Sequence, residues 1–236
     1  MMIKHCFLAL LFCLPLVSFA AGDVPRKGIR LDFRQEKLNW KGRPDSWTYR
    51  GKFVTPAPRY TLVHDPESGD QVLHIVAEKG SGVLMYDISK IDLNKYPVIR
   101  WRWRVHTLPA GADARIREKD DQALAIYIGT GRLTQKSISY TWQTETPKGS
   151  EGVSVYNKVV TTYWYTIRNK TDGCGVWYVE ERDLRDDLTK KLGKVPEELA
   201  LTISVNSQYT GTRASVELDY IEFLEDTKNN SKGVSP

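Results

Sequence analysis

Cysteine is scarce in this chain, and the sequence signatures of several enzyme classes are missing. Cys6 and Cys13 lie in the first twenty residues, so Cys174 has no partner for an internal disulfide in the remainder. The four histidines do not have the spacing of a zinc site. No P-loop, G-x-S-x-G or H-E-x-x-H motif occurs. A disulfide scaffold and the best-marked nucleotide, esterase and metalloprotease sites are therefore not indicated.

A strong charge of either sign is also lacking. The chain has 34 Lys and Arg against 29 Asp and Glu, a net charge of +5, and no long basic run. Nucleic-acid binding is not expected from so mild and dispersed an excess. A weak attraction to anionic polymers remains open.

Long apolar runs are absent except at the start, "MMIKHCFLALLFCLPLVSFA". Lys4 precedes an apolar run over 6–17, and the small residues Ser18 and Ala20 follow, as in a secretory signal peptide. A membrane anchor is the alternative, but the run is short and Pro15 interrupts it. We predict a signal peptide over 1–20, export to the periplasm or beyond, and no transmembrane anchor after cleavage.

Short segments with period-two alternation dominate the remaining chain. They are rich in Val, Ile, Thr, Tyr and Trp, which is typical of strands, and glycine- or proline-rich turns separate them. The segments are 71–78, 82–89, 98–105, 122–129, 137–144, 160–167, 199–206 and 215–224, with weaker ones at 31–33 and 46–53. This pattern predicts an all-β fold, a jelly-roll-like antiparallel β-sandwich. We expect one domain over 21–225 and a disordered tail over 226–236.

One short helix is expected near 184–192. In "RDLRDDLTKKLGKVP", Leu184, Leu188 and Leu192 recur on one helical face, and Gly193 and Pro196 end the segment.

The segment "PVIRWRWRV" (97–105) raises the main functional question. On a strand, Trp101 and Trp103 share one face, while Arg100, Arg102 and Arg104 share the other. The tryptophans are expected in the core. The arginines can pair with acids such as Glu118, Asp120 and Asp121, or bind a ligand, and both alternatives stay open.

We predict a ligand-binding groove lined by charged and aromatic side chains. The candidate residues are Arg102, Arg104, Asp120, Asp121, Tyr127 and Trp142. Arginines and acids would supply charge-assisted hydrogen bonds, and the aromatic rings would stack on sugars.

Two further constellations are weaker. A carboxylate from Asp120–Asp121 or from Glu180–Glu181 could serve as a general acid or base in a polysaccharide hydrolase or lyase. Asp32 and Asp219, near the first and last strands, could hold a structural calcium ion, or could simply face solvent. No catalytic residue and no other cofactor is assigned.

The blocks "WRWRV", "EKDD", "SYTW", "ERDLRDDLTKKLGKVP" and "ASVELDYIEF" resemble the bacterial exported family called domain of unknown function 3047. The resemblance covers nearly the whole chain after the predicted signal peptide, and it implies no activity. More loosely, a first "LDF", a mid-chain strand after a proline and a last "DYIEF" are similar in arrangement to jelly-roll carbohydrate-binding modules. Our leading hypothesis is an exported, non-catalytic β-sandwich that binds a carbohydrate or a related polar or anionic polymer. The alternatives are the hydrolase or lyase and an envelope assembly protein with a flat apolar patch.

Overall fold

The computed structural model describes residues 26–130, 135–156 and 160–226. The predicted signal peptide and the predicted tail after Asp226 lie outside these residues. One sheet, called the first sheet here, contains β1 (Gly28–Asp32), β3 (Arg59–His64), β4 (Gln71–Glu78), β6 (Val98–Thr107), β11 (Tyr178–Asp183) and β13 (Arg213–Leu224). The second sheet contains β2 (Thr48–Gly51), β5 (Ser81–Asp87), β7 (Gln122–Gly129), β8 (Gln135–Trp142), β9 (Glu151–Tyr156), β10 (Val160–Arg168) and β12 (Ala200–Asn206).

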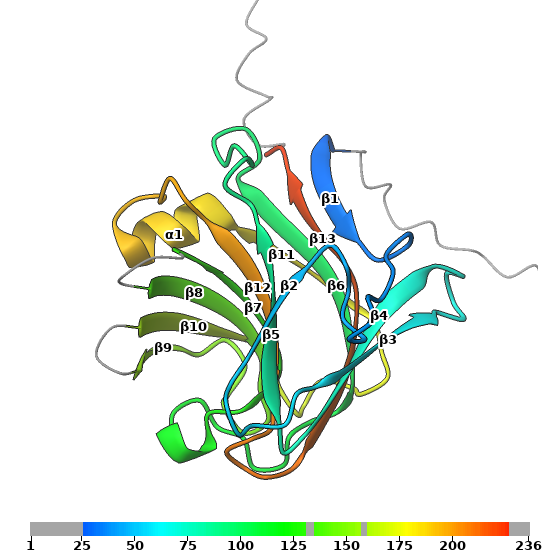
Figure 1. The fold of residues 1–236 in the computed structure, drawn as a ribbon. Coiled ribbons are helices and arrows are strands. Elements are labelled where there is room, and N and C mark those ends of the chain that lie inside the picture. Colours follow the sequence, from blue (N-terminus) through cyan, green and yellow to red (C-terminus); the bar gives the residue numbers. More distant parts are fainter. Residues whose placement is uncertain (1–25, 131–134, 157–159, 227–236) are drawn as a thin grey trace, which may run out of the picture.

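The two sheets face each other as the layers of a sandwich (Figure 1). The first sheet has the order β11-β6-β13-β4-β3, with β1 paired to the far end of β13. The second has the order β2-β5-β12-β7-β8-β10-β9. The pairings are antiparallel except for β8 with β10, which run parallel. The predicted all-β, jelly-roll-like sandwich is thus confirmed.

The core lies between the sheets, and β6 shows why. Trp101 and Trp103 are fully buried. The Trp101 ring stacks on Tyr140 of β8 at 5.1 Å between centroids, and Trp103 packs against Trp142 at 5.5 Å. Burying aromatic area of this size stabilises the fold at roughly 25 cal/mol per Å². Because strand side chains alternate, the arginines of β6 lie on the outer face of the first sheet.

The predicted helix is present as α1 (Leu184–Leu192). Asp183 caps its first turn by accepting a hydrogen bond from the backbone N–H of Asp186, and Gly193 ends it with φ of +83°. Leu184 and Leu188 are buried, and α1 packs against β8 and β11 (Figure 1).

The predicted strands all occur, and β4 and β7 have the predicted bounds. Three further strands, β3, β9 and β11, were not predicted. All three lie at the edge of a sheet. Since an edge strand is only half covered, its sequence carries a weaker apolar alternation.

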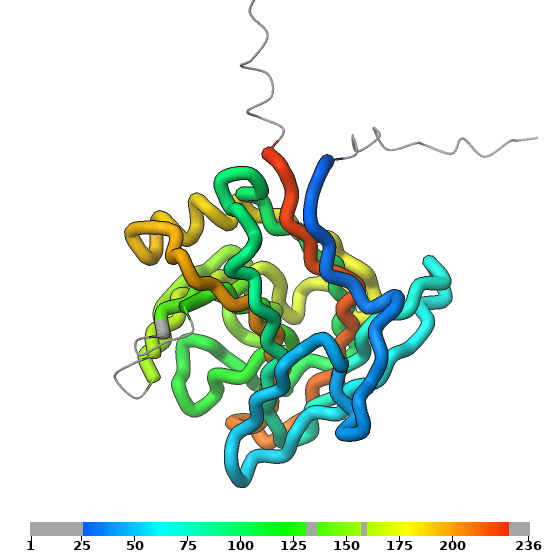
Figure 2. Tube along the Cα trace, turned by 45° about the horizontal axis from the view of Figure 1, so that its top comes forward, coloured from blue at the N-terminus to red at the C-terminus, as the bar shows by residue number. Residues whose placement is uncertain are grey.

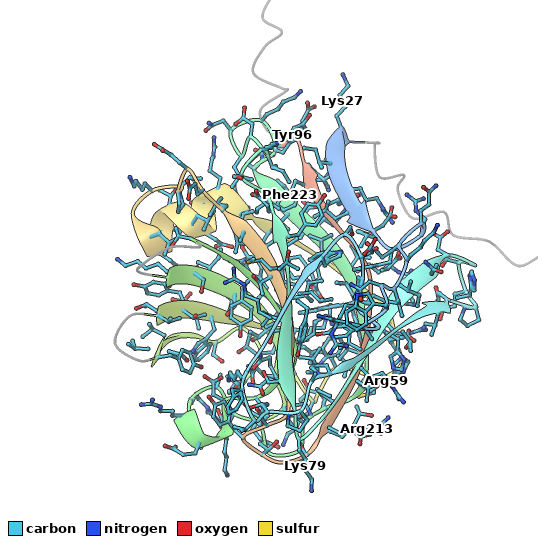
Figure 3. All side chains as sticks on the ribbon, in the orientation of Figure 1. Lys27, Arg59, Lys79, Tyr96, Arg213 and Phe223 are labelled. Atoms are coloured by element: carbon cyan, nitrogen blue, oxygen red, sulfur yellow. The ribbon has the colours of Figure 1, made fainter. Side chains whose placement is uncertain are left out.

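The first and last described strands lie side by side, as Figure 2 shows for the blue and red ends of the tube. In this register Asp32 is opposite Tyr220. In Figure 3, Lys27, Lys79 and Arg213 point away from the sandwich, whose interior is filled by side chains of both sheets. In the described part of the chain, no helix combines the length and the apolar character needed to cross a bilayer.

Candidate functional site

The arginines of β6 are paired with acids of the neighbouring strand β13. Arg100 Nε bonds Glu222, Arg102 Nη1 lies 2.6 Å from Asp219, and Arg104 Nε donates to Glu217 at 2.8 Å. The predicted partners Glu118, Asp120 and Asp121 were wrong, because the following strand, β7, lies in the other sheet. Of the two alternatives left open, internal pairing therefore holds for these arginines.

A second layer closes over the two inner arginines. The Trp177 ring lies 4.2 Å from the Arg102 guanidinium carbon and 4.4 Å from that of Arg104. Its indole N–H donates to Asp65 at 3.1 Å, and Asp65 also lies 3.2 Å from Arg104. Burial raises the pKa of the Asp65 carboxyl, but the bonds from Trp177 and Ser68 and the charge of Arg104 bring it below its ordinary value. Arg102 and Arg104, with 17% and 9% of their side chains exposed, form a closed and paired layer.

Trp142 lies in the core and has no exposed surface. Its indole N–H donates to the backbone carbonyl of Asn169 at 3.3 Å. The ring therefore has no face available for a sugar, contrary to the role predicted for it.

The acids proposed for catalysis have internal partners, with one exception. Asp121 accepts hydrogen bonds from Tyr209 N–H, Thr210 N–H and Thr210 Oγ1, at 3.1, 2.7 and 2.8 Å. Glu180 pairs with Arg168, and Glu181 pairs with Arg26. Asp120 is the exception, because its carboxylate faces hydroxyl groups and, among the residues that the structure describes, no cation within ion-pair distance. These acids do not assemble into a two-carboxylate cleft.

The acids proposed for calcium are bonded to arginines. Asp32 accepts from Arg34 Nε at 2.9 Å and lies 3.3 Å from Arg30, and Asp219 pairs with Arg102. In residues 26–130, 135–156 and 160–226 no group of three or more His, Cys, Asp or Glu side chains is arranged to hold a metal ion. Calcium binding by Asp32 and Asp219 stays a prediction.

The outer face of the second sheet has a different chemistry, and we call it the hydroxyl face. The outward side chains of three adjacent strands are mostly hydroxylic. They are Ser137, Ser139 and Thr141 of β8, Thr162, Trp164 and Thr166 of β10, and Ser154 and Tyr156 of β9. Trp164 lies opposite Ser139 on one side and Gly152 on the other. Its ring covers Gly152 so closely that a Cβ there would lie 2.2 Å from a ring carbon.

Tyr156 bonds to Asp120 beside this face, and Tyr127 and Tyr209 lie in the same neighbourhood; we call these three tyrosines with Asp120 the tyrosine cluster. Tyr156 Oη and Ser154 Oγ both donate to Asp120 Oδ2, the latter at 3.2 Å. Tyr127 of β7 and Tyr209 of the turn after β12 lie near enough for their hydroxyls to sense the charge of Asp120. Tyr209 is 42% exposed, whereas Tyr127 and Tyr156 are half-buried.

The electrostatics of the cluster follow from its partial burial. Burial raises the pKa of Asp120, the charge of Asp121 adds to this, and the bonds from Tyr156 and Ser154 oppose it. Burial also raises the pKa of Tyr156 and Tyr127, so both hydroxyls stay protonated at neutral pH. The cluster thus offers one carboxylate, hydroxyl donors and aromatic faces in one place.

Lys52 borders the cluster from the loop between β2 and β3. Its ammonium lies 5.5 Å from the centre of the Tyr209 ring. Burial lowers the pKa of Lys52, and the charges of Asp121 and Asp120 partly offset this. A hydrogen bond at 3.4 Å from Thr55 Oγ1 to Gln208 ties the two loops together.

Of the predicted site residues, Asp120 and Tyr127 are in the cluster, and Asp121 supports the Tyr209 turn behind it. Arg102 and Arg104 are on the outer face of the other sheet. Tyr156, Tyr209 and Lys52 were not predicted. The alternation in "EGVSVY" could have placed Tyr156 on a strand, but nothing local links it to Asp120, 36 residues away.

A separate open hollow of about 650 Å³ lies at the end of β1, lined by Asp32, Arg34, Gln35, Glu36 and Ser46. Its acids are already bonded. Asp32 pairs with arginines, and Glu36 accepts from the backbone N–H of Asp45 and of Ser46. It contains no aromatic side chain. The hollow therefore offers less for recognition than the tyrosine cluster.

The fold and these faces define a two-layer β-sandwich of jelly-roll type with a hydroxyl- and tyrosine-lined face. Residues 45–222 match the family described as Protein of unknown function (DUF3047), and the chain belongs to this family. A sequence search of curated proteins finds no match.

Solved structures with a similar arrangement include sugar-binding modules and an enzyme. The family 11 carbohydrate-binding module of Clostridium thermocellum, in complex with a mixed-linked tetrasaccharide, is 9% identical, with a TM-score of 0.40 over 80% of this chain and 94% of that one. The family 30 module of the cellulosomal cellulase Cel9D-Cel44B of the same organism is 13% identical, with a TM-score of 0.42 over 77% and 93%. A cellulase derived from Cel12A of Rhodothermus marinus is 12% identical, with a TM-score of 0.42 over 84% and 100%. No ligand or residue role is carried over from them.

Proposed function

We propose that this protein is exported and binds a carbohydrate, without catalysis, at the tyrosine cluster. The observation that carries the proposal is the carboxylate of Asp120, which accepts a hydrogen bond from Tyr156 of a distant strand and has Tyr127 and Tyr209 in its neighbourhood. The arginine layer on the opposite sheet, by contrast, is closed, and its charges are paired with each other.

Each part of the cluster has a role in sugar recognition. The exposed ring of Tyr209 gives an apolar face on which the C–H face of a sugar stacks. Asp120 Oδ2 is occupied by Tyr156 and Ser154, which leaves Oδ1 to accept a sugar hydroxyl. The hydroxyl of Ser154, which is partly exposed beside Asp120, can also accept a hydrogen bond. Polar groups around an aromatic face are what a polyhydroxylated ligand requires.

The test is calorimetry with cell-envelope polysaccharides after a glycan array has selected binders. Tyr209→Ala and Asp120→Asn should each weaken binding about tenfold or more, because each removes a contact of about 1.5 kcal/mol or more. Trp40→Ala is the matched control, since Trp40 is an aromatic residue 89% exposed in the loop between β1 and β2. The proposal would be contradicted if no glycan on the array bound, or if all three variants bound with equal affinity.

A hydrolase or lyase acting on the same class of ligand is the second candidate. It is favoured by the raised pKa of Asp120, which suits a general acid. Incubation with a bound polysaccharide should then release new reducing ends, and Asp120→Asn should abolish the release. Binding without any product would leave the non-catalytic function as the better account.

A further inference from the structure

Two cations near the tyrosine cluster are not paired with carboxylates, unlike the arginines of the paired layer on the other sheet. The Lys52 ammonium lies beside the Tyr209 ring, and Arg117 belongs to the turn η1 (Arg117–Lys119), where its backbone carbonyl accepts a hydrogen bond from the N–H of Asp120 at 3.4 Å. Among the described residues, neither cation has a carboxylate within ion-pair distance. On the opposite sheet, by contrast, Arg102 and Arg104 are within 2.6 and 2.8 Å of carboxylate oxygens.

The acids near these cations take their hydrogen bonds from other donors and not from the cations. Asp121 receives three hydrogen bonds from Tyr209 and Thr210. Asp120 receives two at Oδ2, from Tyr156 and Ser154. The hydrogen-bonding capacity of Lys52 and Arg117 is therefore available to an incoming group. Both cations can donate charge-assisted hydrogen bonds, which are stronger than neutral ones.

The loop that holds Lys52 is shaped to keep it at the rim. Val54 has φ of +59°, in the left-handed region that β-branched residues rarely adopt, and a backbone bond from Thr55 N–H to Lys52 C=O closes the turn. Phe53 is 94% exposed at the tip of this turn. This turn thus carries an exposed aromatic ring next in sequence to the cation that lies beside Tyr209.

We propose that the ligand is an acidic saccharide whose anionic group lies between Lys52 and Arg117 while its ring stacks on Tyr209. This inference rests on the proposed function and deepens it by naming the charge of the ligand. A carboxylate of a uronic acid and a sulfate ester share the required chemistry, and the experiment separates them.

The experiment is titration calorimetry with four tetrasaccharides: tetragalacturonate, its methyl ester, a sulfated tetrasaccharide and cellotetraose. Tetragalacturonate should bind about tenfold more tightly than its methyl ester, since one charged hydrogen bond corresponds to about that factor. Lys52→Gln and Arg117→Gln should each remove most of this preference without changing the affinity for the ester. Lys95→Gln is the matched control, because Lys95 also lies over a tyrosine ring, Tyr96, at 5.0 Å.

The outcomes distinguish this inference from the function on which it rests. Equal binding of the acid, the ester and cellotetraose, unchanged in Lys52→Gln, would overturn the acidic ligand and leave carbohydrate binding intact. Binding of the sulfated sugar alone would support the acidic ligand and identify its group as a sulfate. If none of the four sugars and no glycan on a wider array binds, both the acidic ligand and carbohydrate binding are overturned.

Discussion

Asp120 and Asp121 are adjacent in the sequence but have different roles. Asp121 is fully buried and organises the turn that carries Tyr209. Asp120 faces the hydroxyls of Tyr156 and Ser154 on another strand. Their carboxylates thus have different partners at the end of the turn η1, and only that of Asp120 faces the cluster.

The raised pKa of Asp120 predicts a pH-dependent stability. A carboxyl whose pKa is higher in the folded state stabilises the fold below its unfolded-state pKa, and this contribution is lost as the pH rises through the folded-state pKa. We therefore expect the free energy of unfolding of the wild type, relative to Asp120→Asn, to increase as the pH falls from about 7 to about 4. Urea denaturation at several pH values measures it.

The comparison with the variant isolates Asp120 from its surroundings. The other groups that face it, Tyr156, Tyr127, Asp121 and Lys52, are the same in both proteins. A difference that stays constant between these pH values, or that decreases on acidification, would contradict the burial argument.

At the scale of elements, β6 buries its tryptophans on one face and pairs its arginines with acids on the other. Arg104 lies between Asp65 and Glu217, and all three side chains are at most one-tenth exposed. Among the described residues, removal of the cation leaves buried Asp65 with only the more distant Arg102, at 3.6 Å, and buried Glu217 with only His106, which is charged only when protonated. Such a loss costs more than the pair itself contributes, because the desolvated acids stay behind.

Arg104→Met should therefore lower the free energy of unfolding by about 3–5 kcal/mol. Arg213→Met is the control. Arg213 pairs with Glu78 at the surface, where both side chains are about half exposed or more, so the loss should be below about 1 kcal/mol. Thermal denaturation of both variants tests this. Similar small effects would mean that the layer contributes little to stability.

The packing of β9 against β10 requires a glycine at position 152, because the Trp164 ring leaves no room there for a side chain. A Cβ at Gly152 would lie 2.2 Å from the Trp164 ring, whereas one at Gly173 would meet nothing closer than 3.5 Å. Gly152→Ala should destabilise the protein by about 1–3 kcal/mol and change the tryptophan fluorescence, and Gly173→Ala should do neither. Since Tyr156 is on the same strand, the first variant should also weaken sugar binding. Equal stability of both variants would contradict this packing.

The sequence predicted the features of single elements but not the contacts between distant ones. Alternation predicted both faces of β6, and leucine spacing and capping residues predicted α1, because these features depend on local geometry. The partners of the arginines were not predictable, since they come from β13 and from Asp65, and sheet order is a long-range property. Tyr156 was missed for the same reason, because its partner Asp120 lies across the sheet.

At the scale of the whole molecule, the two outer faces of the sandwich have opposite characters. The face of the first sheet pairs its arginines with its own acids. The face of the second carries hydroxyls and half-buried tyrosines, and beside them lie Lys52 and Arg117, which have no carboxylate partner within the part of the chain that the structure describes. Binding is therefore expected on the second sheet alone. Export remains a proposal from the sequence of residues 1–20.

Export makes a prediction for the full chain. When residues 1–236 are produced in a bacterium with a periplasm, the protein recovered there should begin at Ala21, as determined by intact mass and N-terminal sequencing. A variant with Lys in place of Leu11, in the middle of the apolar run, should stay unprocessed. Recovery of the wild type with residues 1–20 still attached would contradict cleavage after Ala20.

The most direct test of the account is to map the binding face by two-dimensional ¹⁵N–¹H NMR during titration with tetragalacturonate. The account predicts chemical-shift changes at Tyr127, Tyr156 and Tyr209 and an unchanged indole N–H of Trp177. Changes at Trp177 and Arg104, with the tyrosine cluster unaffected, would place the site on the opposite sheet and contradict it.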